Sequence, residues 1–131
     1  MNHFYPGMGA TSSMYGDLWK KEFEGQFHNW PTWQGERTLQ DIAERIIKEH
    51  KIESGDTVIG TSLGGILACE IANQIDLKRI VLIGSAQSKE EINSILSAPH
   101  PKDANHTIDG GHLIVMTHPL ECIQPIKEEQ P

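Results

Sequence analysis

A serine set between glycines is the first group in this sequence that could do chemistry. Residues 60–64 read Gly60-Thr61-Ser62-Leu63-Gly64, a G-x-S-x-G motif between the apolar segments DTVIG and LGGILACEIANQI. A strand that turns directly into a helix crowds its own backbone, so residues without a Cβ are expected at Gly60 and Gly64, and the serine hydroxyl is pushed out over the sheet edge. The Leu63 amide would open the helix, where N–H groups stabilise an oxyanion. The motif therefore predicts a nucleophilic Ser62 and one oxyanion donor.

The same motif has a second interpretation without a nucleophile. A Gly-x-Ser-x-Gly-Gly sequence also closes a tight turn between a strand and a helix, and its amides can cradle a phosphate. We favour the catalytic interpretation because a predicted strand precedes the motif and a predicted helix follows it.

The elements that must position Ser62 alternate between strands and helices. Apolar runs and turn signals predict strands at 3–5, 26–29, 56–60, 78–85 and 105–109, and helices at 12–23, 38–50, 63–75, 88–98 and 119–124. This alternation predicts an α/β, doubly wound fold with a mainly parallel sheet and helices on both faces. Ligands in such sheets bind at the carboxyl ends of the strands.

His112 follows Gly110-Gly111 at the end of the last predicted strand, which places it at the same sheet edge as Ser62. The chain has seven histidines, so a surface or packing role is the alternative. The four histidines of the C-terminal third recur every six residues, which matches no compact zinc spacing. We therefore predict no metal site.

Composition limits the partners. A chain of 131 residues fits a single domain, 1–131. The net charge is −7 and the Lys and Arg residues are scattered, so the sequence has no basic patch that could bind the phosphate backbone of a nucleic acid, and no nucleic-acid partner is expected. The N-terminus has no signal-peptide pattern and no segment approaches the roughly 20 apolar residues that span a bilayer, so we expect no membrane association and a cytoplasmic protein. Cys69 and Cys122 fall in predicted helices and are expected to be reduced, buried thiols.

With Ser62, two further segments make the chain resemble the α/β-hydrolase family. HFYPGMGATSSMY is similar to the family's strand and oxyanion loop, with Pro6 where a histidine is usual, and TIDGGHLIVMTHPLECI is similar to its last strand, histidine loop and terminal helix. The resemblance covers most of residues 3–86 and 105–124. It implies that the Met8 amide is the second oxyanion donor and His112 the general base. It also implies a minimal hydrolase-like core of five strands in the order 2-1-3-4-5.

The sequence departs from the family's pattern where the triad acid is usually found. Residues 86–111, between Ser85 and His112, are too few for a further strand with its helix, or for a lid. Asp103 precedes the last strand and belongs at the opposite edge of the sheet. Glu90 and Asp109 remain candidates for the acid, and its absence is the third alternative.

The reaction that we expect is hydrolysis of a small carboxylic ester or thioester by a serine hydrolase of the esterase type, without cofactor or metal. The expected partner is a small-molecule acyl substrate. The alternative is a catalytically impaired hydrolase-like scaffold that acts as a binding module. A homodimer is also considered, because a shortened sheet exposes apolar surface. Loop residues Met8, Met14, Trp30 and Trp33 could line an acyl pocket or anchor the loops to the sheet.

Overall fold

The computed structural model describes residues 1–7, 11–32, 34–83, 106–108 and 119–128. Within these ranges, strands and helices alternate along most of the chain. The strands are β1 (Asn2–Tyr5), β2 (Gln26–Phe27), β3 (Thr57–Thr61), β4 (Arg79–Ile83) and β5 (His106–Ile108). The helices are the 3₁₀-helix η1 (Ser12–Tyr15) and the α-helices α1 (Gly16–Glu22), α2 (Leu39–Glu49), α3 (Leu63–Gln74) and α6 (Pro119–Glu128).

The strands form one sheet in which neighbouring strands run parallel, in the order β2-β1-β3-β4-β5. The α/β class and the parallel sheet predicted from the alternation of elements are therefore confirmed. Pairing is longest in the centre, where β3 and β4 pair from Thr57 with Arg79 to Thr61 with Ile83. The edge strand β2 pairs with β1 at two positions only.

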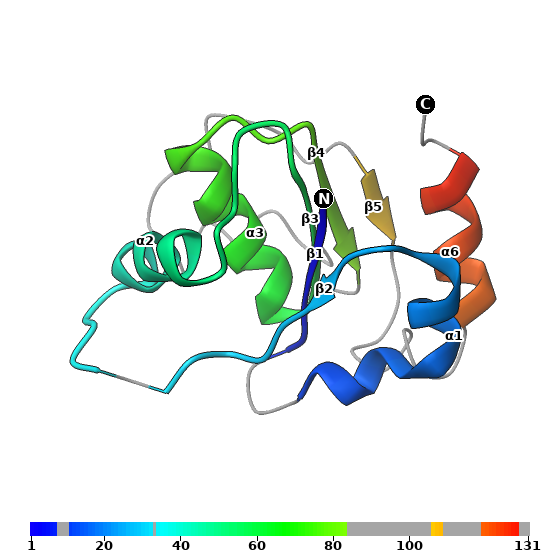
Figure 1. The fold of residues 1–131 in the computed structure, drawn as a ribbon, viewed down its shortest axis with the longest axis horizontal. Helices are drawn as coiled ribbons and strands as arrows, with labels where there is room; N and C mark the ends of the chain where they lie inside the picture. The colour runs from blue at the N-terminus through cyan, green and yellow to red at the C-terminus, as the bar shows by residue number, and fades with distance from the viewer. Residues whose placement is uncertain (8–10, 33, 84–105, 109–118, 129–131) are drawn as a thin grey trace.

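Helices cover both faces of the sheet, with α2 and α3 on one face and α1 and α6 on the other (Figure 1). Successive strand residues point to opposite faces, and the two cores follow this alternation. Val58 and Leu82 pack with α2 and α3, whereas Ile59, Val81 and Ile83 pack with α1 and α6. Because both faces are covered, β3 and β4 are buried at all of their positions.

Helix α2 illustrates how local signals produce an element. Thr38 precedes it with extended backbone, and its side chain accepts a hydrogen bond from the Asp41 amide at 3.1 Å. The apolar spacing of the helix places Ile42, Ala43 and Ile46 in the core against α3. The predicted start at Thr38 is confirmed.

Most described elements match the predicted ranges to within one or two residues, and three differ in a way that has a structural reason. Strand β2 ends at Phe27, before His28 and Asn29. The predicted helix 12–23 is divided into η1 and α1 at Gly16, whose φ of 72° interrupts the regular helix. Helix α6 continues through Pro125 to Glu128. The predicted helix 88–98 lies outside the described residues.

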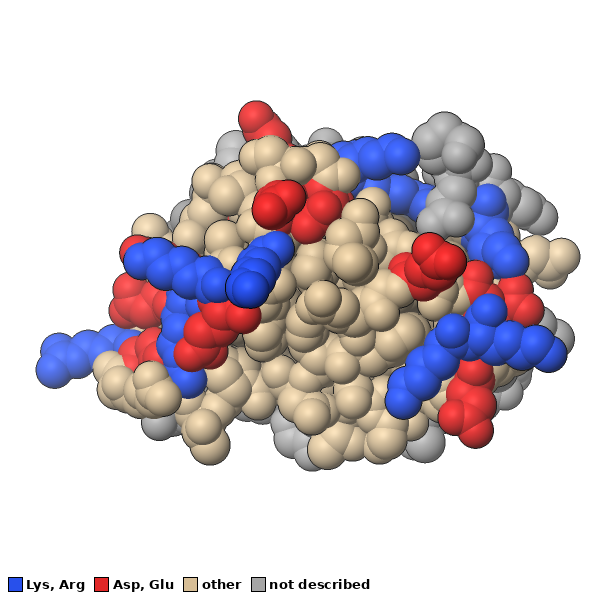
Figure 2. Space-filling view, in the orientation of Figure 1, with Lys and Arg blue, Asp and Glu red and all other residues tan. Residues whose placement is uncertain are grey.

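Charged side chains on the face in Figure 2 gather mostly towards its two ends, with both signs in each group and an uncharged stretch between them. Ion pairs account for part of this mixing: Arg45 with Glu36 and Glu49 beside α2, and Lys127 of α6 with Glu22 of α1. None of the helices described is long and apolar enough to cross a membrane.

Candidate active site

Ser62 occupies the turn that joins β3 to α3, at the carboxyl end of a central strand. Its backbone has φ 56° and ψ −123°, a conformation that non-glycine residues rarely adopt. The Ser62 amide donates to the Ile83 carbonyl at the end of β4 at 2.9 Å, and Leu63 is the first residue of the helix. Ser62 is partly exposed, whereas every residue of β3, which precedes it, is buried. The turn thus presents a hydroxyl beside the amino end of a 12-residue helix.

The two glycines of the motif are required by close backbone approach. A Cβ on Gly60 would overlap the carbonyl group of Gly64, and a Cβ on Gly64 would lie 2.5 Å from the carbonyl oxygen of Tyr5 and 2.7 Å from that of Pro6. Real Cβ atoms do not approach backbone atoms so closely. The expectation that residues without a Cβ are needed at Gly60 and Gly64 is therefore confirmed.

The buried side chain of Tyr15 forms hydrogen bonds with the carboxyl ends of β1 and β3, the two strands that end at this site. The Tyr15 hydroxyl donates to the Tyr5 carbonyl at 2.6 Å and lies 2.8 Å from the Thr61 hydroxyl. Burial raises the pKa of Tyr15 well above its usual range, so the hydroxyl stays protonated and able to donate. Tyr15 thereby links the last residue of β1 to the residue before Ser62.

The segment after β1 passes directly beside the serine. A Cβ built on Gly7 would lie 3.4 Å from Cβ and 3.8 Å from Oγ of Ser62, so the Gly7 backbone borders the site. The Pro6 carbonyl accepts a hydrogen bond from Nε1 of Trp30 at 2.8 Å. Trp30 packs against the core formed with α2 and α3 and is half-buried, which fits its interpretation as a loop anchor.

Ser62 lies in the turn between β3 and α3 and Leu63 begins α3, and the roles predicted for both residues stay predictions. Met8, His112, Glu90 and Asp109 lie outside the described residues, so their positions stay predictions. Strand β5 ends at Ile108, four positions before His112, and runs parallel to β4. The carboxyl end of β5 therefore lies at the same sheet edge as Ser62.

A second polar cluster, which the sequence analysis did not single out, lies alongside β1, from Asp56, which precedes β3, to Tyr5, the last residue of β1. We call it the histidine cluster: His3, His28, His50, Asp56 and Tyr5. Nε2 of His3 lies 3.0 Å from Oδ2 of Asp56, Nδ1 of His3 lies 2.9 Å from Nε2 of His28, and the Tyr5 hydroxyl lies 2.8 Å from Nδ1 of His50. The rings of His28 and His50 are stacked, with centroids 3.9 Å apart.

Burial dominates the electrostatics of this cluster. It lowers the pKa of His28 from 6.5 to about 3, and the neighbouring His50 and His3 rings act in the same direction. Burial likewise lowers the pKa of His50. Burial alone would raise the pKa of Asp56, but hydrogen bonds from the Glu53 amide and His3 outweigh it and lower that pKa. His28 and His50 are therefore neutral at pH 7, whereas Asp56 is charged.

A cavity of about 490 Å³ borders the histidine cluster and is also lined by residues of both charges, including Glu49, Lys51 and Glu53. It lies at the amino edge of the sheet, away from Ser62. No three metal-ligating side chains in the described part of the chain are arranged to hold a metal ion. Stacked imidazole rings direct their lone pairs side by side rather than towards one point, which agrees with this finding.

The parallel sheet, the helices on both faces and the serine turn at the carboxyl end of β3 define an α/β-hydrolase fold. Among solved structures, the chain is similar to RedJ, a thioesterase from the prodiginine biosynthetic pathway in Streptomyces coelicolor, and to BorB, a type II thioesterase from the borrelidin biosynthetic cluster.

The similarity to these structures is one of fold. RedJ with a PEG molecule in its active site matches with a TM-score of 0.65 and 13% identity over 98% of this chain and 88% of that one. BorB matches with a TM-score of 0.65 and 14% identity over 97% and 90% of the two chains. No protein-family model and no curated protein matches the sequence. The expected resemblance to the α/β-hydrolases is thus confirmed for the fold.

Proposed function

We propose that the chain is a serine hydrolase that cleaves a small carboxylic ester or thioester. Ser62 is the nucleophile of a nucleophile elbow, His112 is the general base, and the amides of Met8 and Leu63 form the oxyanion hole. The small-molecule acyl substrate binds at the carboxyl edge of the sheet, where ligands of α/β folds bind.

The reaction follows from these roles. The Ser62 hydroxyl attacks the acyl carbon while His112 takes its proton, and the negative charge moves to the former carbonyl oxygen, held by the two amides. The intermediate collapses, the leaving thiolate or alkoxide takes the proton from His112, and the acyl group stays on Ser62. Water, deprotonated by His112, then attacks the acyl-enzyme; as the bond to Ser62 breaks and the carboxylic acid leaves, His112 returns the proton to the Ser62 oxygen.

The observation that carries this proposal is the backbone of Ser62. A φ of 56° on a serine costs free energy, of order 1–3 kcal/mol, and such strain clusters where a side chain must be presented for function. The glycines at Gly60 and Gly64 hold the turn in this form, and Gly7 borders the hydroxyl. A turn that served only to connect β3 with α3 could carry glycine at this position without that cost.

A thioester is the first substrate class to test, because the solved structures of similar fold, RedJ and BorB, are thioesterases. We expect faster turnover of a short acyl thioester, such as an N-acetylcysteamine derivative, than of the matched oxygen ester.

Labelling with a fluorophosphonate tests the nucleophile. The Ser62 hydroxyl displaces fluoride from phosphorus, so we expect one covalent adduct on the Ser62 peptide in intact-mass and peptide-mapping experiments. Ser62→Ala should abolish the adduct and turnover while the fold is kept, and His112→Ala should slow both. A folded protein that gives no adduct would contradict the proposal.

The triad acid is tested by isosteric amides. If Glu90 or Asp109 orients the base, Glu90→Gln or Asp109→Asn lowers kcat by several orders of magnitude, as loss of a triad carboxylate does elsewhere. If both variants are as active as the parent, neither carboxylate is the triad acid, and the proposed site consists of a serine and a histidine alone.

One observation favours a second candidate, the catalytically impaired scaffold that acts as a binding module. Strand β5 pairs directly with β4, so no strand intervenes between them to carry the usual acid. Without a carboxylate, the base is neither oriented nor stabilised when protonated. The labelling experiment separates the two candidates, because a scaffold with an uncoupled Ser62 gives no adduct.

A further inference from the structure

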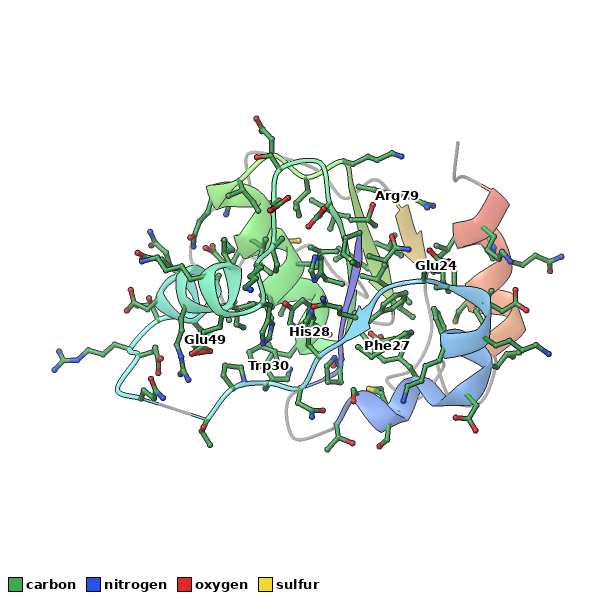
Figure 3. All side chains as sticks on the ribbon, viewed as in Figure 1. Glu24, Phe27, His28, Trp30, Glu49 and Arg79 are labelled. Atoms are coloured by element: carbon green, nitrogen blue, oxygen red, sulfur yellow. The ribbon has the colours of Figure 1, made fainter. Side chains whose placement is uncertain are left out.

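The three residues that follow β2 form hydrogen bonds with β1, with the residue after β1 and with the start of η1. We call residues 28–30 the strap. The His28 amide donates to the Phe4 carbonyl at 2.9 Å, Nε1 of Trp30 donates to the Pro6 carbonyl at 2.8 Å, and Oδ1 of Asn29 accepts from the Ser12 amide at 2.7 Å. The strap therefore holds the chain both where it leaves β1 and where it enters η1. Figure 3 shows His28 and Trp30 on this stretch between β2 and α2.

The hydrogen bond from Trp30 to the Pro6 carbonyl oxygen fixes the orientation of the whole Pro6–Gly7 peptide group. The Pro6 carbonyl and the Gly7 amide belong to one planar trans peptide and point in opposite directions. A donor that holds the carbonyl oxygen thus sets the direction of the Gly7 N–H. Gly64 packs against the same peptide, since a Cβ there would lie 2.7 Å from the Pro6 oxygen.

This peptide is next to the reacting group. A Cβ added to Gly7 would be in van der Waals contact with the Ser62 side chain, so the Gly7 backbone lies beside that side chain, just before the loop proposed to carry the oxyanion donor. Oxyanion stabilisation depends on amides that are already aimed at the developing charge, and a displacement of about 1 Å costs on the order of 100-fold in rate. The orientation of the Pro6–Gly7 peptide is therefore a condition for any amide of this segment to act.

We propose that Trp30 is a positioning residue: through its indole N–H it holds the Pro6–Gly7 peptide in the orientation that the oxyanion side of the Ser62 site requires. This inference rests on the proposed hydrolase function. It assigns Trp30 a role beyond packing, because the ring contributes to the core with α2 and α3 while the N–H points at the Pro6 carbonyl. Packing and donation can be separated by substitution.

Trp30→Phe keeps an aromatic ring and removes the donor. We expect kcat for a short acyl thioester to fall about 10- to 100-fold with KM within about twofold, because the lost alignment acts on the transition state more than on bound substrate. The rate of fluorophosphonate labelling of Ser62 should fall by a similar factor. Thr38→Val is the matched control: it also removes one side-chain hydrogen bond to backbone, but at the start of α2, so kcat should stay within about twofold of the parent.

A second measurement follows the peptide itself. In the ¹H–¹⁵N spectrum, the Gly7 amide should shift and exchange with solvent at least about tenfold faster in Trp30→Phe than in the parent or in Thr38→Val. A parent protein that labels and turns over, with kcat and Gly7 exchange unchanged in Trp30→Phe, would overturn the inference. A parent protein without adduct or turnover would overturn the proposed function instead, and Gly7 exchange would still report whether Trp30 holds this peptide.

Discussion

At the scale of single residues, Gly64 shows how closely the site is built. Its α-carbon lies under the Tyr5 and Pro6 carbonyl groups, so a methyl group there must displace the end of β1 or the start of α3. Gly64→Ala should lower the free energy of unfolding by about 2–3 kcal/mol, the upper part of the usual range for overpacking, because the overlap is with backbone atoms. Urea denaturation monitored by circular dichroism measures this change.

Gly55→Ala is the control for that substitution. Gly55 has φ 92° but no atom within 4 Å of an added Cβ, so its replacement costs backbone strain of about 1 kcal/mol without overlap. Equal losses at Gly55 and Gly64 would show that the carbonyl groups of Tyr5 and Pro6 yield freely, against the close packing described for the serine turn.

At the scale of elements, helix α2 depends on its first turn. Thr38→Ala removes the hydroxyl that accepts from the Asp41 amide and should lower the free energy of unfolding by about 1 kcal/mol, whereas Thr38→Ser, which keeps the hydroxyl, should stay within about 0.5 kcal/mol of the parent. Thermal and urea unfolding of the three proteins measure these differences. Equal stability of the alanine and serine variants would contradict the capping role.

The elements that could be predicted from sequence are those set by local signals. The start of α2 at Thr38 and the burial of β4 follow from a capping residue and from an unbroken apolar run. The end of β2 could not be predicted from local sequence signals. After Phe27 the chain leaves the sheet because Asn29 and Trp30 bind Ser12 and Pro6, and these contacts exist only in the folded chain.

The length of α6 has a similar cause. The sequence predicts a helix over 119–124, and proline at position 125, which lacks an amide donor, does not end it. Cys122, Ile123 and Ile126 are buried against the sheet, and the buried Arg79 of β4 donates to the Ile126 carbonyl at 2.9 Å. Long-range packing and a hydrogen bond from another element thus support the last turn. Figure 3 shows Arg79 on the side of β4 that faces this helix.

At the scale of the whole molecule, the histidine cluster makes stability depend on pH. The pKa of His28 is about 3 in the folded protein, and that of His50 is also lowered, so between pH 6.5 and about 3 the unfolded chain binds more protons than the folded one. Stability is therefore full above pH 6.5 and is lost as the pH falls through this range. The lowered pKa of Asp56 acts in the same direction at the acid end.

Urea denaturation at several pH values between 7.5 and 4.5 tests this prediction. The unfolding free energy of the parent should fall with pH at a slope of about one to two protons, smaller where the half-buried rings are screened by solvent. His28→Gln removes one of these protons and should flatten the slope. The same slope in both proteins would show that His28 titrates alike in the folded and unfolded chain.

The two polar sites differ in how far they could be predicted. Ser62 and Leu63 belong to a motif of five consecutive residues whose glycines indicate a sharp turn, so a candidate nucleophile and a candidate oxyanion donor could be predicted from local sequence alone. His3 and Asp56 are 53 positions apart and meet only because β3 pairs with β1. No spacing rule links residues that are brought together by strand order alone.

The position of β1 inside the sheet has a consequence for the time course of folding. Phe4 pairs with Ile59, which is added to the chain 55 residues later, or about 3–11 s later at a synthesis rate of about 5–20 residues per second. Until then the apolar strand that becomes part of the sheet's interior has no partner on its β3 side. Such non-local pairing makes folding slow and leaves the emerging chain open to aggregation. Slower translation of residues 28–61 would lengthen this exposure, and a chaperone that binds extended apolar segments would protect β1 during it.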